Sequence, residues 1–439
     1  MTLLKQIEAA GIVGCGGAGF PTHKKLNCKV EYLIVNAAEC EPLLRTDRWL
    51  MVNKAEEIVT AAAMTGAMTG AAHIYIALKE TYDEEINALT EAIKKTASPV
   101  KLFRMKNFYP AGDEQIMVCD VTGRTVPPSG IPLDVGCVIS NTATMYSIYQ
   151  ASRDQIFTRK YLTMTGAVAN PVIVHAPLGA SFADCLAMAG GTSLEDYHVL
   201  VGGPMMGKHV ALDSKITKTT KGLIVLPEDH PLIQDVKLPI PKMLHMAKAA
   251  CCHCSMCSEV CPRHLIGHRI EPNKTIRFAS YGSLCDGSDT PMIAFLCSEC
   301  RLCQYACIMN LQPWKVNHEL KGIMAKQGIK STLHNQPESV HPMREYKRFP
   351  IKKLIARLGL TKYNVAAPLT ELTTEIDHVS IPVGQHIGAP AVPCVSVGDT
   401  VAKGDVIAQP AEGKLGACIH ASISGTVKAI ADGCISIEK

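Results

Sequence analysis

Two runs of cysteines in the middle of the chain have the spacing of iron–sulfur ligands. Each run reads C-x2-C-x2-C-x3-C. Two-residue spacers let three thiolates of one loop converge on one cluster, and the fourth thiolate follows just beyond the loop. The sequence therefore predicts two [4Fe–4S] clusters. The cysteines concerned are Cys251, Cys254, Cys257, Cys261, Cys297, Cys300, Cys303 and Cys307.

This spacing resembles that of two-cluster bacterial ferredoxins, in which the fourth cysteine of each run ligates the other cluster. The resemblance implies that Cys261 and Cys307 are exchanged between the runs. One cluster is then expected on Cys251, Cys254, Cys257 and Cys307. The other is expected on Cys297, Cys300, Cys303 and Cys261. Cys252 adjoins the first ligand position without fitting the spacing, and we interpret it as an extra thiol.

Two other interpretations of these cysteines stay open at this point. A pair of zinc sites would normally use two C-x2-C pairs or a mixture of Cys and His. Buried free thiols would not require two identical spacings. The remaining cysteines are scattered and are expected to be small buried side chains. They are Cys15, Cys28, Cys40, Cys119, Cys137, Cys185, Cys285, Cys394, Cys418 and Cys434.

A glycine-rich loop near the start of the chain could hold a phosphate group. It contains Gly14, Gly16, Gly17 and Gly19. Backbone N–H groups without neighbouring side chains can approach an anion, and a lysine at position 24 or 25 can neutralise it. The pattern is formally G-x-G-x-x-G, but the strand expected at 30–36 follows the loop, which argues against a Rossmann fold. A purely structural glycine turn is the alternative.

Polar residues gather where the strand expected at 30–36 ends. Asn36, Glu39 and Glu41 suit contacts to ribose hydroxyls or to a flavin ring, with solvated surface carboxylates as the alternative. Two further polar motifs follow later in the chain. They are Gly112-Asp113-Glu114 and Asn141-Thr142.

Residues 1–155 alternate helical and strand patterns. This rhythm predicts an α/β layer, in which ligands bind beyond the carboxyl ends of the strands. The expected strands are 30–36, 73–78 and 100–105, and the expected helices are 47–70 and 83–96.

The rest of the chain divides into four segments by pattern. Residues 156–228 show short β-like runs broken by Gly and Pro, with one helix near 182–189. Residues 235–330 are helical around the cysteines. Residues 331–372 are polar and basic, and are expected to be a solvated linker or, alternatively, a patch for an acidic partner. Residues 373–439 are β-rich with glycine turns.

Composition excludes several classes of function. A net charge of +4 and an aromatic content of 5% speak against a nucleic-acid-binding protein. The longest apolar stretch, 58–78, is interpreted as a buried helix running into a strand and not as a membrane span. Because no signal peptide is recognisable at Met1, the thiols are expected in a reducing compartment, the cytoplasm.

The glycine loop and the polar motifs resemble the flavin- and NADH-binding subunit of respiratory complex I, and more closely the RnfC component of the Rnf electron-transport complex. The resemblance implies an FMN phosphate on Gly14, Gly16, Gly17 and Lys25. It implies the flavin ring and ribityl chain near Asn36, Glu39, Asn141 and Thr142, with Gly19, Gly112 and Asp113 in the same motifs. It implies NADH near Phe20, Glu41 and Glu114. The resemblance is stronger for FMN than for NADH, because Ala38 stands where complex I has an acid and no aromatic residue follows Lys25.

Two further segments resemble modules of the same family. Residues 156–228, with the stretch Gly202-Gly203-Pro204-Met205-Met206-Gly207, are similar to the ligand-binding β-grasp (SLBB) module. Residues 373–439 are similar to a lipoyl-type barrel-sandwich hybrid. The hairpin tip at 421–423 contains no lysine, so covalent biotin or lipoate is excluded and a docking or scaffolding role is expected. The predicted fold class is thus multidomain α/β plus α+β.

With the barrel-sandwich at the C-terminus, the domain order resembles the corrinoid (cobalamin) reductases of propanediol-utilisation microcompartments. The segment 261–268 and the Pro390-x-x-Pro393-Cys394 motif support this resemblance. It implies an NADH-dependent oxidoreductase with FMN and two [4Fe–4S] clusters that reduces cobalamin, free or on a corrinoid-carrying enzyme. It also implies a location in a bacterial microcompartment, with a shell protein or an adenosyltransferase as a partner. No oligomeric state is indicated.

Other functions stay open on the sequence alone. One is an Rnf-like electron-transfer module that feeds another reductase, such as an amino-acid reductase. A second is a non-enzymatic iron–sulfur protein of the microcompartment. A zinc-stapled binding protein is the third.

Overall fold

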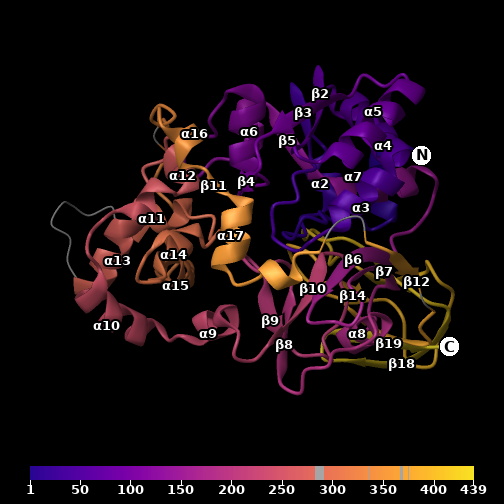
Figure 1. Cartoon of the computed structure of the whole chain (residues 1–439). Helices are drawn as coiled ribbons and strands as arrows, with labels where there is room; N and C mark the ends of the chain where they lie inside the picture. Colours follow the sequence, from indigo (N-terminus) through magenta and orange to yellow (C-terminus); the bar gives the residue numbers. More distant parts are fainter. Residues whose placement is uncertain (282–290, 335, 366–368, 374) are drawn as a thin grey trace.

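The computed structural model describes residues 1–439 except 282–290, 335, 366–368 and 374. Its N-terminal part is built on a parallel four-stranded sheet (Figure 1). The strands lie in the order β3 (Lys101–Met105), β2 (His73–Lys79), β1 (Tyr32–Asn36) and β5 (Cys137–Asn141).

The central strand β1 is apolar on both faces because helices cover both faces of the sheet. Leu33 and Val35 pack into one core and Ile34 into another. The first core contains residues of α1 (Leu3–Ala9), α3 (Thr46–Asn53), α4 (Ala55–Thr69), α5 (Asp83–Lys95) and α7 (Thr142–Ser152). The second contains residues of α6 (Glu114–Thr122). The short elements of this part are α2 (Thr22–Lys25), β4 (Phe108–Tyr109) and η1 (Pro132–Val135).

The expected strands and helices of this layer are confirmed, with one difference. The helix expected over 47–70 is two helices, α3 and α4, because the backbone of Lys54 leaves the helical region between them. The sequence patterns do not predict β5 and α6. No helix in the described part of the chain is both long and apolar enough to cross a membrane.

The next part is a six-stranded mixed sheet with one packed helix, α8 (Phe182–Met188). The expected helix and β-runs are thus confirmed. The order of the strands is β12 (Glu371–Thr373), β7 (Val172–Pro177), β6 (Arg159–Gly166), β10 (Gly222–Pro227), β8 (Tyr197–Val201) and β9 (Lys208–Val210).

The cysteine runs lie in a part made of short helices, seen at the left of Figure 1. Cys251 ends α10, Cys257 lies in α11, and Cys303 lies in α14. The elements are α9 (Pro231–Lys237), α10 (Ile240–Ala250), α11 (Met256–Glu259), α12 (Pro262–Leu265), α13 (Pro272–Tyr281), η2 (Pro291–Leu296), α14 (Leu302–Ala306) and α15 (Pro313–Lys326).

The interpretation of residues 331–372 as a solvated linker is wrong. Leu354, Leu358 and Leu360 are buried in a core shared with the six-stranded sheet. β12 also adds a strand to that sheet by pairing with β7. The elements here are α16 (Arg344–Lys347), β11 (Phe349–Pro350), α17 (Ile351–Arg357) and η3 (Thr361–Tyr363).

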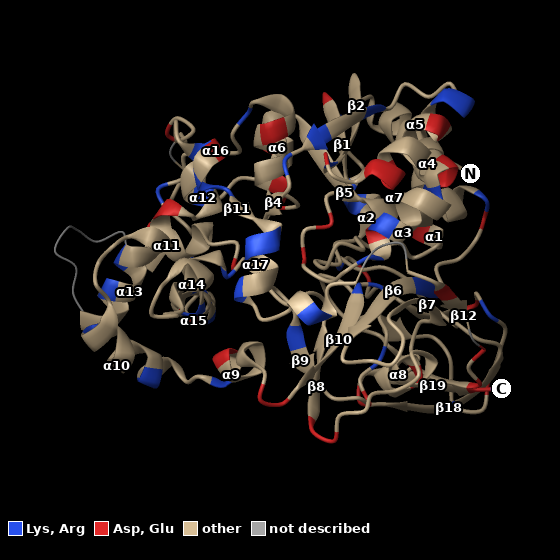
Figure 2. Ribbon diagram, viewed as in Figure 1, with Lys and Arg blue, Asp and Glu red and all other residues tan. Residues whose placement is uncertain are grey.

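The basic residues at 344–353 are largely used inside the molecule. Arg344 and Arg348 both bind Asp120 of α6, with nitrogen–oxygen distances of 2.7 and 2.8 Å, and Lys347 pairs with Glu259. Of this basic run, only Lys352 and Lys353 stay exposed, on α17 (Figure 2). Most of the positive charge that a patch for an acidic partner would need is therefore already paired with carboxylates of the same chain.

The C-terminal part consists of two small antiparallel sheets around one apolar core. The hairpin tip at 421–423 is buried, and the Ser422 hydroxyl donates to the Leu178 carbonyl at 2.6 Å. The tip therefore packs against the residue that directly follows β7 of the six-stranded sheet. One sheet has β13 (His378–Pro382), β19 (Cys434–Glu438), β18 (Gly425–Ala431) and β15 (Thr400–Val401). The other has β14 (Val392–Pro393), β16 (Val406–Gln409) and β17 (Ile419–His420).

A buried lysine joins three of these parts. The Lys218 ammonium donates to the carbonyls of Gly11 and Cys418, each at 2.7 Å, and its backbone N–H donates to Gln385 Oε1 at 2.9 Å. Burial lowers the pKa of Lys218 to about 7. Its ammonium is therefore held at a cost in solvation that two carbonyl contacts only partly offset.

We predict that Lys218 makes the stability of this junction depend on pH. The folded pKa lies below the unfolded value, so the unfolded chain binds more protons above pH 7 and stability rises with pH. Relative to Lys218→Met, the wild-type chain should gain at most about 1.4 kcal/mol per pH unit between pH 7 and 8.5. Urea denaturation of both proteins across that window measures the difference. A constant difference would contradict the prediction.

Candidate functional site

The glycine loop is anchored at both ends and open at its tip. The Gly14 N–H donates to the Phe20 carbonyl at 2.9 Å, and the Cys15 N–H donates to Thr144 Oγ1 at 3.0 Å. Residues 16–18 are exposed. The φ angles of Gly17 and Gly19 are +120° and +71°, which side chains other than glycine rarely allow. The loop therefore presents bare backbone to solvent, as a phosphate cradle requires.

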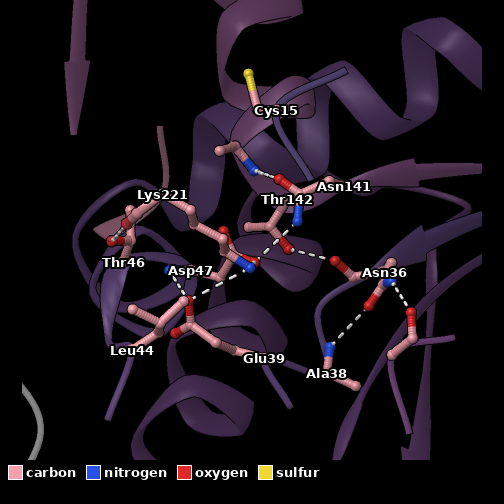
Figure 3. A network of polar contacts seen from close by, with 12 residues as sticks. Cys15, Asn36, Ala38, Glu39, Leu44, Thr46, Asp47, Asn141, Thr142 and Lys221 are labelled. Carbon is pink, nitrogen blue, oxygen red and sulfur yellow. Dashed lines mark hydrogen bonds and ion pairs between the residues drawn. The ribbon is translucent and has the colours of Figure 1, made fainter. Parts of the chain in front are cut away.

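The loop lies against the carboxyl edge of the parallel sheet. Asn36 and Asn141 end the neighbouring strands β1 and β5 and are register partners. A Cβ placed on Gly16 would lie 3.4 Å from Asn141 Cβ. The Thr142 hydroxyl donates to the Asn36 carbonyl at 3.0 Å, and the Asn36 amide donates to the Gly112 carbonyl at 2.8 Å. The structure thus brings together the predicted residues of the loop, the strand ends and the Gly112 motif. Figure 3 shows the contact between Thr142 and Asn36.

A buried ion cluster supports this edge. The Lys221 ammonium lies 2.6 Å from Asp47 Oδ2 and 3.4 Å from Glu39 Oε1. The Asn141 amide donates to Asp47 Oδ2 at 2.8 Å (Figure 3). Burial raises the pKa of Glu39, although Lys221 opposes the shift. Burial lowers the pKa of Lys221, but Asp47 and Glu39 outweigh it and the pKa is raised. Glu39 is thus occupied by Lys221.

Glu41 points to a different part of the molecule. Its carboxylate accepts the backbone N–H groups of Met205 and Met206, at 2.9 and 3.0 Å. A Cβ on Gly203 would lie 2.1 Å from Glu41 Oε2, so the distinctive Gly-Gly-Pro-Met-Met-Gly stretch is built to receive this carboxylate. Burial raises the pKa of Glu41 to about 7. Within the described residues, the recorded hydrogen bonds of Glu41 are with this stretch and none is with the glycine loop.

The other motif residues make ion pairs across elements. The Lys25 ammonium lies 2.8 Å from Glu114 Oε1. Asp113 caps α6 by accepting the N–H groups of Gln115 and Ile116, and it also binds Arg263, at 2.9 Å. Because Arg263 comes two residues after Cys261, Asp113 connects the loop side of the sheet to the cysteine region. Phe20 is half-buried at the end of the loop.

The eight predicted ligands line two separate cavities. One is bordered by Cys251, Cys254, Cys257 and Cys307, and Cys252 also belongs to its lining. The other is bordered by Cys261, Cys297, Cys300 and Cys303. These are the two groups expected from the exchange of the fourth cysteines. Among the described residues, no three Cys, His, Asp or Glu side chains come as close together as one bound metal ion would need.

The two cysteine groups differ in exposure. Cys261, Cys300 and Cys303 are buried, whereas Cys254 is exposed. Burial raises the pKa of Cys257 and of Cys261 to about 12, and neighbouring cysteines add to the shift. Four such thiolates need a strongly charged partner to stay ionised, which an iron–sulfur cluster supplies. We call these the outer group (251, 254, 257, 307) and the inner group (261, 297, 300, 303).

The scattered cysteines are not all buried as expected. Cys15, Cys119, Cys137 and Cys185 are buried. Cys394 is exposed, because it directly follows the short, solvent-facing edge strand β14. Cys28, Cys40, Cys418 and Cys434 are half-buried. Cys285 lies outside the described residues.

Four family models match along the chain. They are the Nuo51 FMN-binding domain (residues 7–150), the SLBB domain (161–208), a 4Fe-4S dicluster domain (250–312) and the RnfC barrel sandwich hybrid domain (362–438). The predicted fold class and the predicted FMN and [4Fe–4S] cofactors are thereby confirmed.

Curated relatives match over nearly the whole chain. Cobalamin reductase PduS of Citrobacter freundii is 40% identical over 99% of this chain and 96% of its own length. PduS of Salmonella typhimurium is 40% identical with the same coverage. The chain belongs to the PduS cobalamin reductase family. A component of the Na⁺-translocating ferredoxin:NAD⁺ oxidoreductase complex, from Acetobacterium woodii, is 34% identical over 60% of this chain and 58% of its own length.

The residues of this PduS-family chain fit the cofactors of the matching domains. The exposed backbone of residues 16–18 suits a phosphate, and Lys25 stands nearby on α2. All-thiolate donor sets around two cavities suit [4Fe–4S] clusters better than single zinc ions.

Sequence reasoning missed three residues of this PduS-family site. Asp47, Lys221 and Arg263 all act through tertiary contacts with predicted residues. Asp47 lies at the start of a helix shortly after the Glu39–Glu41 motif, and this position could have indicated that it belongs to the site. Lys221 and Arg263 are far away in sequence, and no pattern around them points to the loop.

We predict that Lys221→Met destabilises this PduS-family chain by about 3–5 kcal/mol, because it leaves two buried carboxylates without their cation. Urea denaturation followed by circular dichroism measures the loss. Adding Asp47→Asn should restore part of it, since one of the unpaired charges is then removed. Lys352→Met, an exposed lysine on α17, is the matched control and should change stability by less than about 0.5 kcal/mol. A Lys221→Met protein as stable as this control would contradict the assignment.

Proposed function

We propose that this chain oxidises NADH at a bound FMN and passes the electrons through two [4Fe–4S] clusters to cobalamin. A flavin accepts an electron pair as hydride and releases electrons singly, and iron–sulfur clusters carry one electron at a time. Membership of the PduS family supports cobalamin as the acceptor. The observation that carries the proposal is the continuous contact between the glycine-loop site and the inner cysteine group.

That contact runs through named residues. Asn36 binds the Gly112 carbonyl, and the next residue, Asp113, binds Arg263 at 2.9 Å. The Tyr109 hydroxyl donates to the Cys300 carbonyl at 3.0 Å. Two independent contacts therefore hold the inner group against the sheet edge, which favours short electron transfer from the flavin site to that group.

We propose the outer group as the exit to the acceptor. Its cavity is bordered by apolar side chains, and the neighbouring Ile308, Met309 and Met256 are 71%, 43% and 45% exposed. Exposed apolar side chains around a redox centre suit transient contact with an acceptor. The proposed order is glycine loop, inner group, outer group, acceptor.

For the flavin site we propose that residues 14–19 and Lys25 hold the FMN phosphate. Asn36, Asn141 and Thr142 then border the ring and ribityl chain, because they lie together at the sheet edge. Glu39 would not touch the flavin itself but would help to position Asn141 through Lys221 and Asp47. For NADH, Phe20 and Glu114 lie on the loop side, whereas Glu41 is used by the SLBB part.

The decisive experiment is NADH-dependent reduction of cob(II)alamin by the anaerobically purified chain, followed by the visible spectrum. We expect bleaching of the flavin and cluster absorbance by NADH, and then cob(I)alamin formation. Bleaching without cob(I)alamin unless a partner protein is added would favour the Rnf-like electron-transfer alternative, which the 34% identity to a component of an Rnf-type complex motivates. A chain that holds flavin and iron but is not bleached by NADH would contradict the proposal.

The two cysteine groups should be separable by mutation. Wild type should hold about eight irons per chain, and Cys254→Ser or Cys303→Ser should each lower iron and acid-labile sulfide by about half or more. Cys254→Ser should leave NADH bleaching of the flavin intact while abolishing cobalamin reduction, because only the outer group is damaged. Cys252→Ser is the matched control and should keep the full iron content. Loss of iron in that control with full iron in Cys254→Ser would overturn the ligand set.

We also propose that the protein works in the cytoplasm within a bacterial microcompartment, with a shell protein or an adenosyltransferase as partner. The support is the family membership, together with the exposed Cys254 of the outer group, which a partner could reach. Co-purification of either partner class with the tagged chain tests this point.

A further inference from the structure

A cavity of about 200 Å³ lies where three parts of the chain meet, next to the glycine loop, whose Cys15 is part of its lining. One wall is a face of α7 formed by Ala143, Tyr146, Ser147 and Gln150. A second wall comes from β6 and from His175 of β7, and Lys403 of the C-terminal part closes one side. The first turn of α7, at Ala143, and Cys15 of the glycine loop also line this cavity, so it adjoins the proposed flavin site.

The lining of the cavity is positively charged. Arg159, Lys160 and Lys403 line it, and no Asp or Glu of the described residues does. Two carboxylates lie behind the lining: Glu371, 3.9 Å from His175, and Glu375, 3.7 Å from Arg159. The charged side chains that line the cavity itself are therefore all cationic.

Lys160 is the most informative of these residues. The residue is only 4% exposed, and no ion pair or hydrogen bond of its ammonium is recorded within the described residues. Its nitrogen is not among the fully buried polar atoms that lack a partner, so it keeps contact with the cavity. Its one recorded side-chain contact is with the Phe157 ring, 5.9 Å from the nitrogen. The described residues supply no counter-charge to this ammonium, so an anion bound in the cavity would complete it.

His175 is consistent with this interpretation. Its ring stacks on Tyr161, with centroids 4.0 Å apart and planes at 7°. Burial, together with Arg159, Lys403 and Lys54, lowers the pKa of His175 to about 4. The ring is thus neutral near pH 7, and it offers a hydrogen-bonding nitrogen instead of another charge.

We propose that this cavity binds a small phosphate-bearing anion, held by Lys160, Lys403 and Arg159. A phosphate carries up to two negative charges and several acceptor oxygens, which suits three cationic side chains. The volume lies below the roughly 300–1,000 Å³ of pockets that enclose drug-sized ligands, so a dinucleotide such as NADH is too large. The anion would connect the flavin layer, the SLBB sheet and the C-terminal part.

The test is isothermal titration calorimetry of pyrophosphate into the full, cofactor-loaded chain. Lys160→Met and Lys403→Met should each weaken binding by about tenfold or more, the usual effect of losing a charge-assisted contact. Lys160→Arg should keep the affinity within about threefold because it retains the charge. Lys352→Met is the matched control and should bind like wild type. Because Lys403 is exposed, its variant keeps the test valid even if Lys160→Met does not fold.

Several results would overturn the proposal. These are no heat from pyrophosphate or inorganic phosphate, an unchanged wild-type affinity in both methionine variants, or citrate binding as tightly as pyrophosphate. Competition between added FMN and pyrophosphate in the flavin-free chain would assign the cavity to the flavin site instead. None of these outcomes depends on whether the chain reduces cobalamin.

Discussion

The buried contact of Lys221 with Asp47 and Glu39 is the interaction on which the flavin site depends. It joins the residue that precedes β10 of the SLBB sheet to two carboxylates at the carboxyl edge of the parallel sheet. Asp47 in turn receives the Asn141 amide, so the cluster also sets the position of the strand end that faces the glycine loop. A buried ion triad is not a strong source of stability, but a missing partner is costly, and this couples the two parts.

At the other junctions of the molecule, too, a carboxylate of one part is held by hydrogen-bond donors of another part. Glu41 is held by two backbone N–H groups of the Gly202–Gly207 stretch, and Arg301 of the cysteine region donates to the Gly207 carbonyl at 3.2 Å. Asp113 is held by Arg263. These contacts are directional, so they determine orientation as well as proximity. For an electron carrier, whose chemistry belongs to its cofactors, such orientation is the main task of the polypeptide.

The contrast between the inner and outer cysteine groups gives the proposed path a direction. The inner group is packed against the α/β layer and the core that contains Cys300, Leu302 and Tyr305. The outer group has one exposed cysteine, Cys254, three half-buried ones and an apolar rim. Solvent exposure is one of the factors that set the reduction potential of an iron–sulfur cluster, so the two groups should not be equivalent.

Short-range pattern alone was enough to predict eight candidate cysteine ligands, the glycine loop, the polar strand ends and the alternation of helices and strands in the first layer. Each of these signals lies within a few residues. Only the tertiary structure decided how the charges of the chain are used. The sequence predicts Arg344 and Arg348 to face solvent, yet in the structure they bind Asp120, which is more than 200 residues away along the chain. The resemblance implies that Glu41 lies near NADH, yet in the structure its carboxylate is bound by the SLBB part. Lys221 and Lys160 carried no local signal at all. The choice of an ion's partner depends on which distant surfaces meet and exclude water, and neither spacing nor periodicity contains that information.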